Sequence, residues 1–174
     1  MDLFEGFQAV ANIHPLFVHF PIALLLLSVA LFFAGKFVCK KEFIISAKWN
    51  LVFGAFSGLV TIVTGFIAAS TLPHNEEIHK AMISHRNIMI LAVFLSLNLC
   101  GYIFYRKDLL VAVKNIYFLV GLVLMAALLT IGADYGGKMV FKYGAGTELL
   151  LQKSLNVERG SDDKDKDEKG DHNH

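Results

Sequence analysis

Apolar residues run through this chain in four long stretches that no Asp, Glu, Lys or Arg interrupts. The stretches are Pro15–Gly35, Asn50–Leu72, Asn87–Tyr105 and Asn115–Ala133. Each is about as long as the 20 or so residues that an α-helix needs to cross a hydrocarbon core of about 30 Å. A transmembrane barrel would instead show segments of about 10 residues with alternating polarity, and these are absent. The pattern predicts an all-α integral membrane protein, a four-transmembrane-helix bundle in contact with the lipid bilayer.

The flanking polar residues extend these stretches into helices and define a domain. We predict spans at about 15–38, 49–72, 76–105 and 113–134, within a transmembrane domain of residues 1–157. Asn75 followed by Glu76 and Glu77 is typical of a helix N-cap with acids at the positive end of the dipole, so the third helix is expected to begin there. Residues 158–174 hold seven acids, four bases and no aromatic residue. They are predicted to form a disordered, charged C-terminal tail.

Composition narrows the class of protein further. Of 174 residues, 55% are hydrophobic and only 18% are charged, with a net charge of +1. These values exclude a soluble enzyme and leave no global positive field that would attract nucleic acid. The two cysteines form no CxxC motif, and the sequence contains no hydrolase or nucleotide-binding fingerprint. Whether the chain is an enzyme stays open, and at most it is a redox or electron-transfer component.

The basic residues indicate how the bundle is oriented in its membrane. Seven Lys and Arg residues lie in the first and third connections, and four lie near the spans on the opposite side. Because cytoplasmic loops carry the excess of Lys and Arg, both termini are expected to face outward. We expect the protein in a bacterial inner membrane, where the outward side is the periplasm.

Five histidines precede the tail, and this topology places all of them at the outward end of the bundle. They are His14, His19, His74, His79 and His85. Imidazole is a common ligand of haem iron, copper and zinc, and helix bundles hold cofactors between side chains of facing helices. The histidines therefore predict an outward-facing site for a cofactor, and haem b for electron transfer is the leading candidate.

Helical spacing limits which histidines act together. His14 and His19 are five residues apart, about 140° around a helix, so they do not readily share one metal. The expected axial ligands are His19 and His85, with His79 as the substitute for His85 and His14 as a supporting or interfacial residue. Asp134 is a candidate to orient an imidazole, or a solvated helix end.

Pro21 lies two positions after His19 and is expected to kink the first helix. The kink would open space for a cofactor, or would simply bend an ordinary membrane helix. The alternative to the redox interpretation is a non-redox accessory subunit or small transporter with interfacial histidines.

Three strings of residues carry a resemblance to a known family. They are Ile13–Leu24 with two His and two Pro, His85-Arg86-Asn87, and the glycine-rich Gly136–Gly146. Together they resemble the bacterial membrane-protein family of domain of unknown function 2231. The resemblance implies a four-helix integral membrane domain. Relatives are sometimes joined to c-type cytochrome domains, which suggests a redox partner such as a c-type cytochrome. Many relatives have an Asp near the end of the second helix, where this chain reads Gly65–Ala69.

Overall fold

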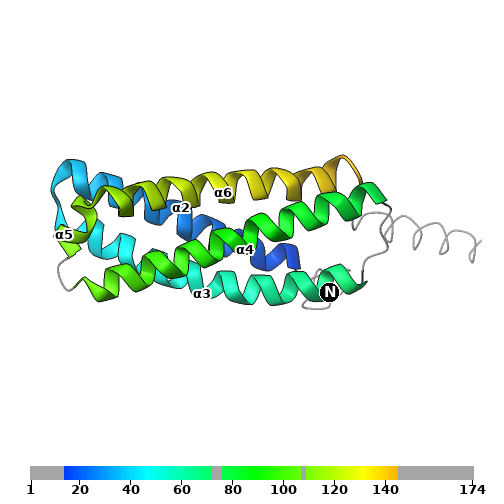
Figure 1. The fold of residues 1–174 in the computed structure, drawn as a ribbon, viewed down its shortest axis with the longest axis horizontal. Helices are drawn as coiled ribbons and strands as arrows, with labels where there is room; N and C mark the ends of the chain where they lie inside the picture. The colour runs from blue at the N-terminus through cyan, green and yellow to red at the C-terminus, as the bar shows by residue number, and fades with distance from the viewer. Residues whose placement is uncertain (1–13, 72–75, 107–108, 145–174) are drawn as a thin grey trace, which may run out of the picture.

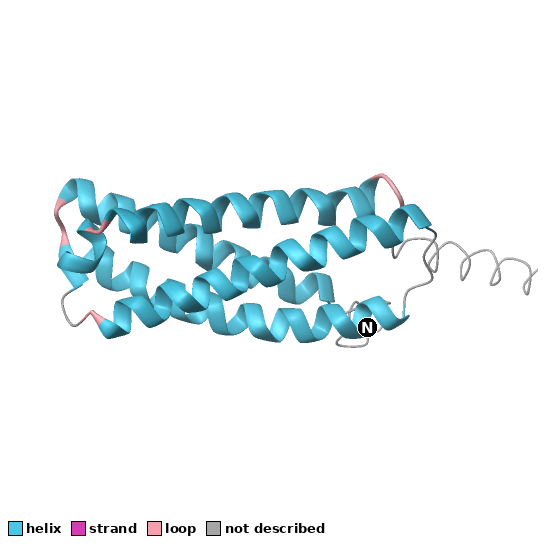
Figure 2. Cartoon of the chain, in the orientation of Figure 1, coloured by secondary structure: helices cyan, strands magenta, loops and turns pink. Residues whose placement is uncertain are grey.

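The computed structural model describes residues 14–71, 76–106 and 109–144, and nearly all of them are helical. The helices are α2 (His14–Val38), α3 (Lys41–Thr71), α4 (Glu76–Tyr105), the short α5 (Leu109–Lys114) and α6 (Ile116–Phe141). Figure 2 shows these helices with short loops between α2 and α3 and between α5 and α6, and the described part of the chain contains no strand. The predicted tail, the proposed cap at Asn75 and His74 lie outside the described residues.

The four long helices lie side by side in an elongated bundle (Figure 1). Each is long and apolar enough to cross a membrane, which confirms the prediction of four membrane-spanning helices. Helix α2 packs on α3, α3 on α4 and α4 on α6, so that α2 and α4 lie on a diagonal of the bundle. The end with the α2–α3 connection and α5 will be called the loop end, and the end where α2 and α4 begin will be called the histidine end.

The helices extend beyond the charge-free stretches. Helix α3 begins at Lys41, before the predicted span at 49–72, and α6 ends at Phe141, beyond the predicted 134. Charged residues mark the limit of the hydrocarbon, but they do not stop a helix that projects into the headgroup region. At the start of α6 the side chain of Asn115 accepts a hydrogen bond of 2.8 Å from the backbone N–H of Tyr117, an N-cap that separates α6 from α5.

Small residues on α3 bring its neighbours close. A Cβ added to Gly54 would lie 2.7 Å from Leu25 of α2, and one added to Gly58 would lie 2.8 Å from Val93 of α4. These contacts agree with the close packing that small residues allow between helices in lipid.

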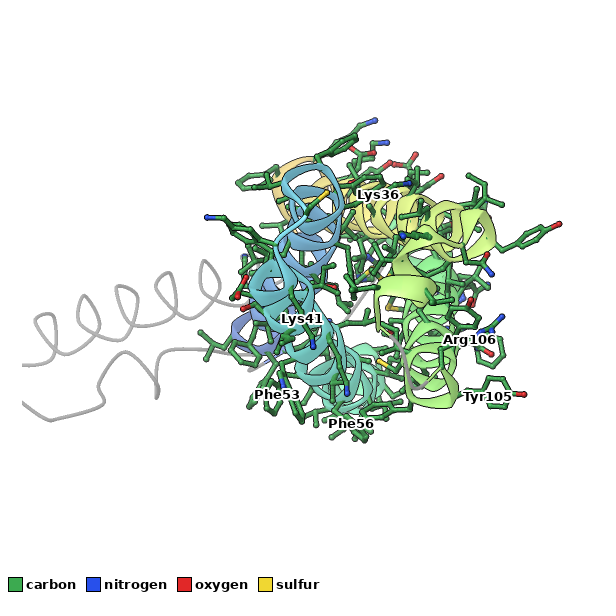
Figure 3. The ribbon with its side chains drawn as sticks, turned by 90° about the vertical axis from the view of Figure 1, so that its left-hand side faces the viewer. Lys36, Lys41, Phe53, Phe56, Tyr105 and Arg106 are labelled. Atoms are coloured by element: carbon green, nitrogen blue, oxygen red, sulfur yellow. The ribbon has the colours of Figure 1, made fainter. Side chains whose placement is uncertain are left out.

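The outer surface is apolar where it would meet lipid. Phe53 and Phe56 of α3 are 57% and 61% exposed, and both point away from the bundle in Figure 3. A soluble bundle would present polar side chains there. Of the two cysteines, Cys39 is exposed and Cys100 is buried, and neither forms a disulfide.

Candidate histidine site

His14 is the first described residue of α2, and its ring packs against α3. The Nδ1 atom of His14 lies 3.0 Å from the hydroxyl oxygen of Thr64. A Cβ added to Gly65 would lie 3.0 Å from Cε1 of the same ring. Gly65 therefore provides the space that the imidazole fills, and Thr64 holds its edge.

The hydrogen bonds of α3 favour one tautomer of His14. The Thr64 hydroxyl donates to the carbonyl oxygen of Thr61 at 3.0 Å, which uses its only proton. Thr64 must then accept from the Nδ1–H of His14. In the neutral ring, Nε2 is consequently the nitrogen with the lone pair. The Thr61 hydroxyl lies 3.3 Å from the carbonyl oxygen of Phe17 and so also links α3 to α2.

His85 makes the corresponding contact from α4 to α6. Its Nδ1 lies 2.7 Å from the carbonyl oxygen of Gly132, which can only accept, so Nδ1–H is the donor and Nε2 again carries the lone pair. A Cβ added to Gly136 would lie 3.3 Å from Cε1 of His85. A second imidazole thus rests on a glycine of the neighbouring helix, with its ring orientation set by a backbone carbonyl.

Both rings lie at the histidine end, one against α3 and the other against α6. Helix α2 begins short of the ends of α3 and α4 at this end (Figure 1), which sets His14 back within the bundle. Both rings are partly buried.

His19 and His79 lie elsewhere. The His19 side chain is exposed, and its Nδ1 lies 2.8 Å from the carbonyl oxygen of Pro15 in its own helix. With His14 directed at α3, a rotation of about 140° turns His19 to another face of α2. His79 is exposed on the first turns of α4. On α2 it is the ring of His14, and not that of His19, that contacts a neighbouring helix. The expectation that His19 is an axial ligand stays a prediction.

Two residues that were candidates for supporting roles have other surroundings. Asp134 forms an ion pair of 2.6 Å with Lys138 one turn along α6, and its side chain is 62% exposed. The acceptor beside His85 is the Gly132 carbonyl. Pro21 is buried, and α2 continues as a helix through it.

The ligands available at this site are few. Among the residues that the structure describes, no group of three or more His, Cys, Asp or Glu side chains is placed to hold a metal ion. A site built on His14 and His85 would thus contribute two imidazole nitrogens.

The fold defines a multi-pass α-helical membrane protein with a pair of anchored imidazoles at one end. The chain belongs to the family described as predicted membrane protein (DUF2231), whose family model matches residues 10–149, more than half of the chain. Neither the curated proteins nor the solved structures contain a significant match to it.

The sequence analysis did not find the residues that position the two rings. Gly65 lies on α3 as Gly54 and Gly58 do, and Gly136 is the first residue of the glycine-rich string, so glycines were the available signal in the sequence. That the glycines face imidazoles is a tertiary relationship between residues about 50 positions apart.

Proposed function

We propose that His14 and His85 are the axial ligands of a haem b and that the chain is a membrane component of electron transfer. The observation that carries this proposal is the shared arrangement of the two rings. Each donates its Nδ1–H to an oxygen of a neighbouring helix and keeps Nε2 as the basic nitrogen. Metal-ligating histidines almost always donate their other N–H to a carbonyl, carboxylate or water, which fixes the tautomer and the ring.

The number of ligands favours haem over a bare metal ion. Zinc sites take three or four protein ligands. A porphyrin brings four nitrogens of its own, so two imidazoles from different helices complete the coordination of its iron. Copper and zinc are the less favoured occupants on this count.

The chain's own residues would then hold and orient the group. When bound, haem supplies one-electron chemistry. Thr64 and the Gly132 carbonyl would fix the tautomer of the two rings, while Gly65 and Gly136 leave room for them. The site lies at one end of the spans, where a redox partner such as a c-type cytochrome has access from the membrane surface. If the membrane is a bacterial inner membrane, the basic residues at the opposite end favour an orientation with the histidine end in the periplasm.

Absorption spectra of the purified protein test this proposal. Protein extracted in detergent from haem-replete cells should show a Soret band and, on reduction, the visible bands of haem b. His85→Ala should lose these bands while it inserts into membranes at the level of the wild type. His79→Ala, in the same helix but with an exposed side chain, serves as the matched control and should keep them.

A wild-type protein without haem absorbance would overturn the redox proposal. Elemental analysis for copper and zinc would then decide between another metal and none. If no metal copurifies, the non-redox accessory subunit or small transporter becomes the better account of the histidines.

A further inference from the structure

The loop end of the bundle carries an excess of positive charge that the described residues do not balance. Its described cations are Lys36, Lys40, Lys41, Lys48, Arg106 and Lys114, against the single acid Glu42. Both ion pairs found among the described residues, Lys80–Glu76 and Lys138–Asp134, belong to the histidine end. Figure 3 views the loop end along the bundle, with Lys36 on α2, Lys41 on α3 and Arg106 directly after the end of α4. This end therefore presents a surface complementary to anions.

Lys48 has the most defined surroundings of these cations. It lies seven residues into α3, about 10 Å along the helix axis, and its side chain is partly buried. Its Nζ is 4.4 Å from the centroid of the Phe104 ring on α4 and 5.5 Å from that of Trp49. The ammonium thus bridges α3 and α4 and rests on aromatic faces rather than on a carboxylate.

The aromatic residues around Lys48 mark the depth of this site in the membrane. Trp49 stacks on Phe53 at 5.9 Å, and Tyr105 at the end of α4 is 83% exposed. Trp and Tyr are enriched at the level of the lipid headgroups. Further into the span, Phe53 and Phe56 face outward toward the acyl chains (Figure 3). A cation at headgroup level therefore sits directly above an exposed apolar surface.

We propose that Lys48, Trp49 and Phe104 form a binding site for one anionic phospholipid at the seam between α3 and α4. The lipid phosphate would pair with the Lys48 ammonium, and an acyl chain would lie along Phe53. Charge complementarity identifies the occupant, because the site offers a cation with no described carboxylate and an adjoining apolar surface. An anionic phospholipid matches both, whereas a soluble anion would leave the rings exposed. The site is at the opposite end from the histidines, so this proposal stands apart from haem binding.

The fluorescence of Trp49 reports on this site directly because it is the only tryptophan of the chain. The protein is reconstituted into phosphatidylcholine vesicles containing a minor share of phosphatidylglycerol. In one set the phosphatidylglycerol has brominated chains, which quench tryptophan on contact, and in the other an equal share of phosphatidylcholine has them. The proposal predicts stronger quenching by the anionic lipid. A lysine near an anionic membrane surface contributes about 1 kcal/mol, so the preference should be about fivefold above that of Lys48→Gln.

Control variants separate a specific site from general attraction. Lys48→Arg should keep the preference, and Lys80→Gln, at the other end and already paired with Glu76, should leave it unchanged. High salt should weaken the preference in the wild type, a second measurement that does not depend on the folding of a variant. Equal quenching by the two lipids in the wild type, or an unchanged preference in Lys48→Gln, would overturn the proposal.

Discussion

The Lys and Arg side chains at the two ends of this bundle have different partners. At the histidine end, Lys80 and Lys138 are paired with carboxylates one turn away in the same helices. At the loop end, Lys48 and Arg106 lie over the rings of Phe104 and Tyr102 instead. Arg86 and Lys142 at the histidine end also lie near aromatic rings. The difference is therefore in ion pairs, because both of those found among the described residues lie at the histidine end. This difference is the one expected if the loop end faces the cytoplasm, as the excess of Lys and Arg in the first and third connections predicts.

The two ends also differ in how their interior is filled. Near the loop end, Phe32 and Tyr102 pack on Phe118 with ring centroids 5.2 and 5.6 Å away. Near the histidine end, Gly65 and Gly136 stand opposite imidazoles. Large aromatic rings fill the core near the loop end, whereas glycines near the histidine end make room for the imidazole rings.

The largest expected effect concerns the orientation of the ends. Reporter fusions placed after Lys41 and after Lys107 should give cytoplasmic signals, and a fusion after Asn75 should give a periplasmic one, because the first and third connections carry the basic excess. The readout is all or none. A periplasmic signal from either basic connection would reverse the assignment of the two ends.

The next effect concerns the space beneath His85. Gly136→Val should displace the ring, since an added Cβ already lies 3.3 Å from it. We expect haem affinity to fall by about 10- to 100-fold, the range found when the support of a metal-ligating histidine is removed. Haem titration of the purified variant measures this. Gly137→Val is the matched control, because nothing lies within 4 Å of an added Cβ there. Equal losses in both variants would point to helix disruption instead.

A smaller loss is expected when only the acceptor of His14 is removed. Thr64→Val keeps the shape of the side chain but cannot accept the Nδ1–H bond. Haem affinity should fall about tenfold, at the lower end of the range for such supports. Thr130→Val removes an exposed hydroxyl that bonds within α6 and should have no effect on the same titration. An unchanged haem affinity in Thr64→Val would show that this hydroxyl does not support haem binding.

The smallest effect is expected from the exposed ion pairs. Glu76→Gln breaks the ion pair with Lys80. The side chain of Lys80 is 74% exposed and that of Glu76 is 83% exposed. Such pairs contribute at most about 0.5 kcal/mol, so the thermal unfolding midpoint in detergent should scarcely move. A large decrease would mean that charge pairing at the histidine end stabilises the bundle more than its solvent exposure suggests.

The number of spanning helices could be predicted from the sequence, whereas the rotation of α2 could not. A charge-free stretch of about 20 residues is long enough for one α-helix to cross the membrane, so each stretch predicts one span. Helix α2, however, is apolar on all faces between His19 and Lys36, so no periodicity tells which histidine points inward. That choice depends on Thr64 and Gly65, which are far away in the sequence. Helix ends differed for a related reason, because Lys41 and Phe141 lie in helices that continue past the hydrocarbon.

The most direct test of the interior histidine pair is the reduced-minus-oxidised absorbance spectrum of His14→Ala beside that of His19→Ala. The two residues share a helix and a spacing of five, but only His14 contacts α3 from a partly buried position. With both variants inserted at wild-type levels, His14→Ala should lose the haem bands and His19→Ala should keep them. Retention in His14→Ala together with loss in His19→Ala would contradict the account and make the exposed imidazole the ligand.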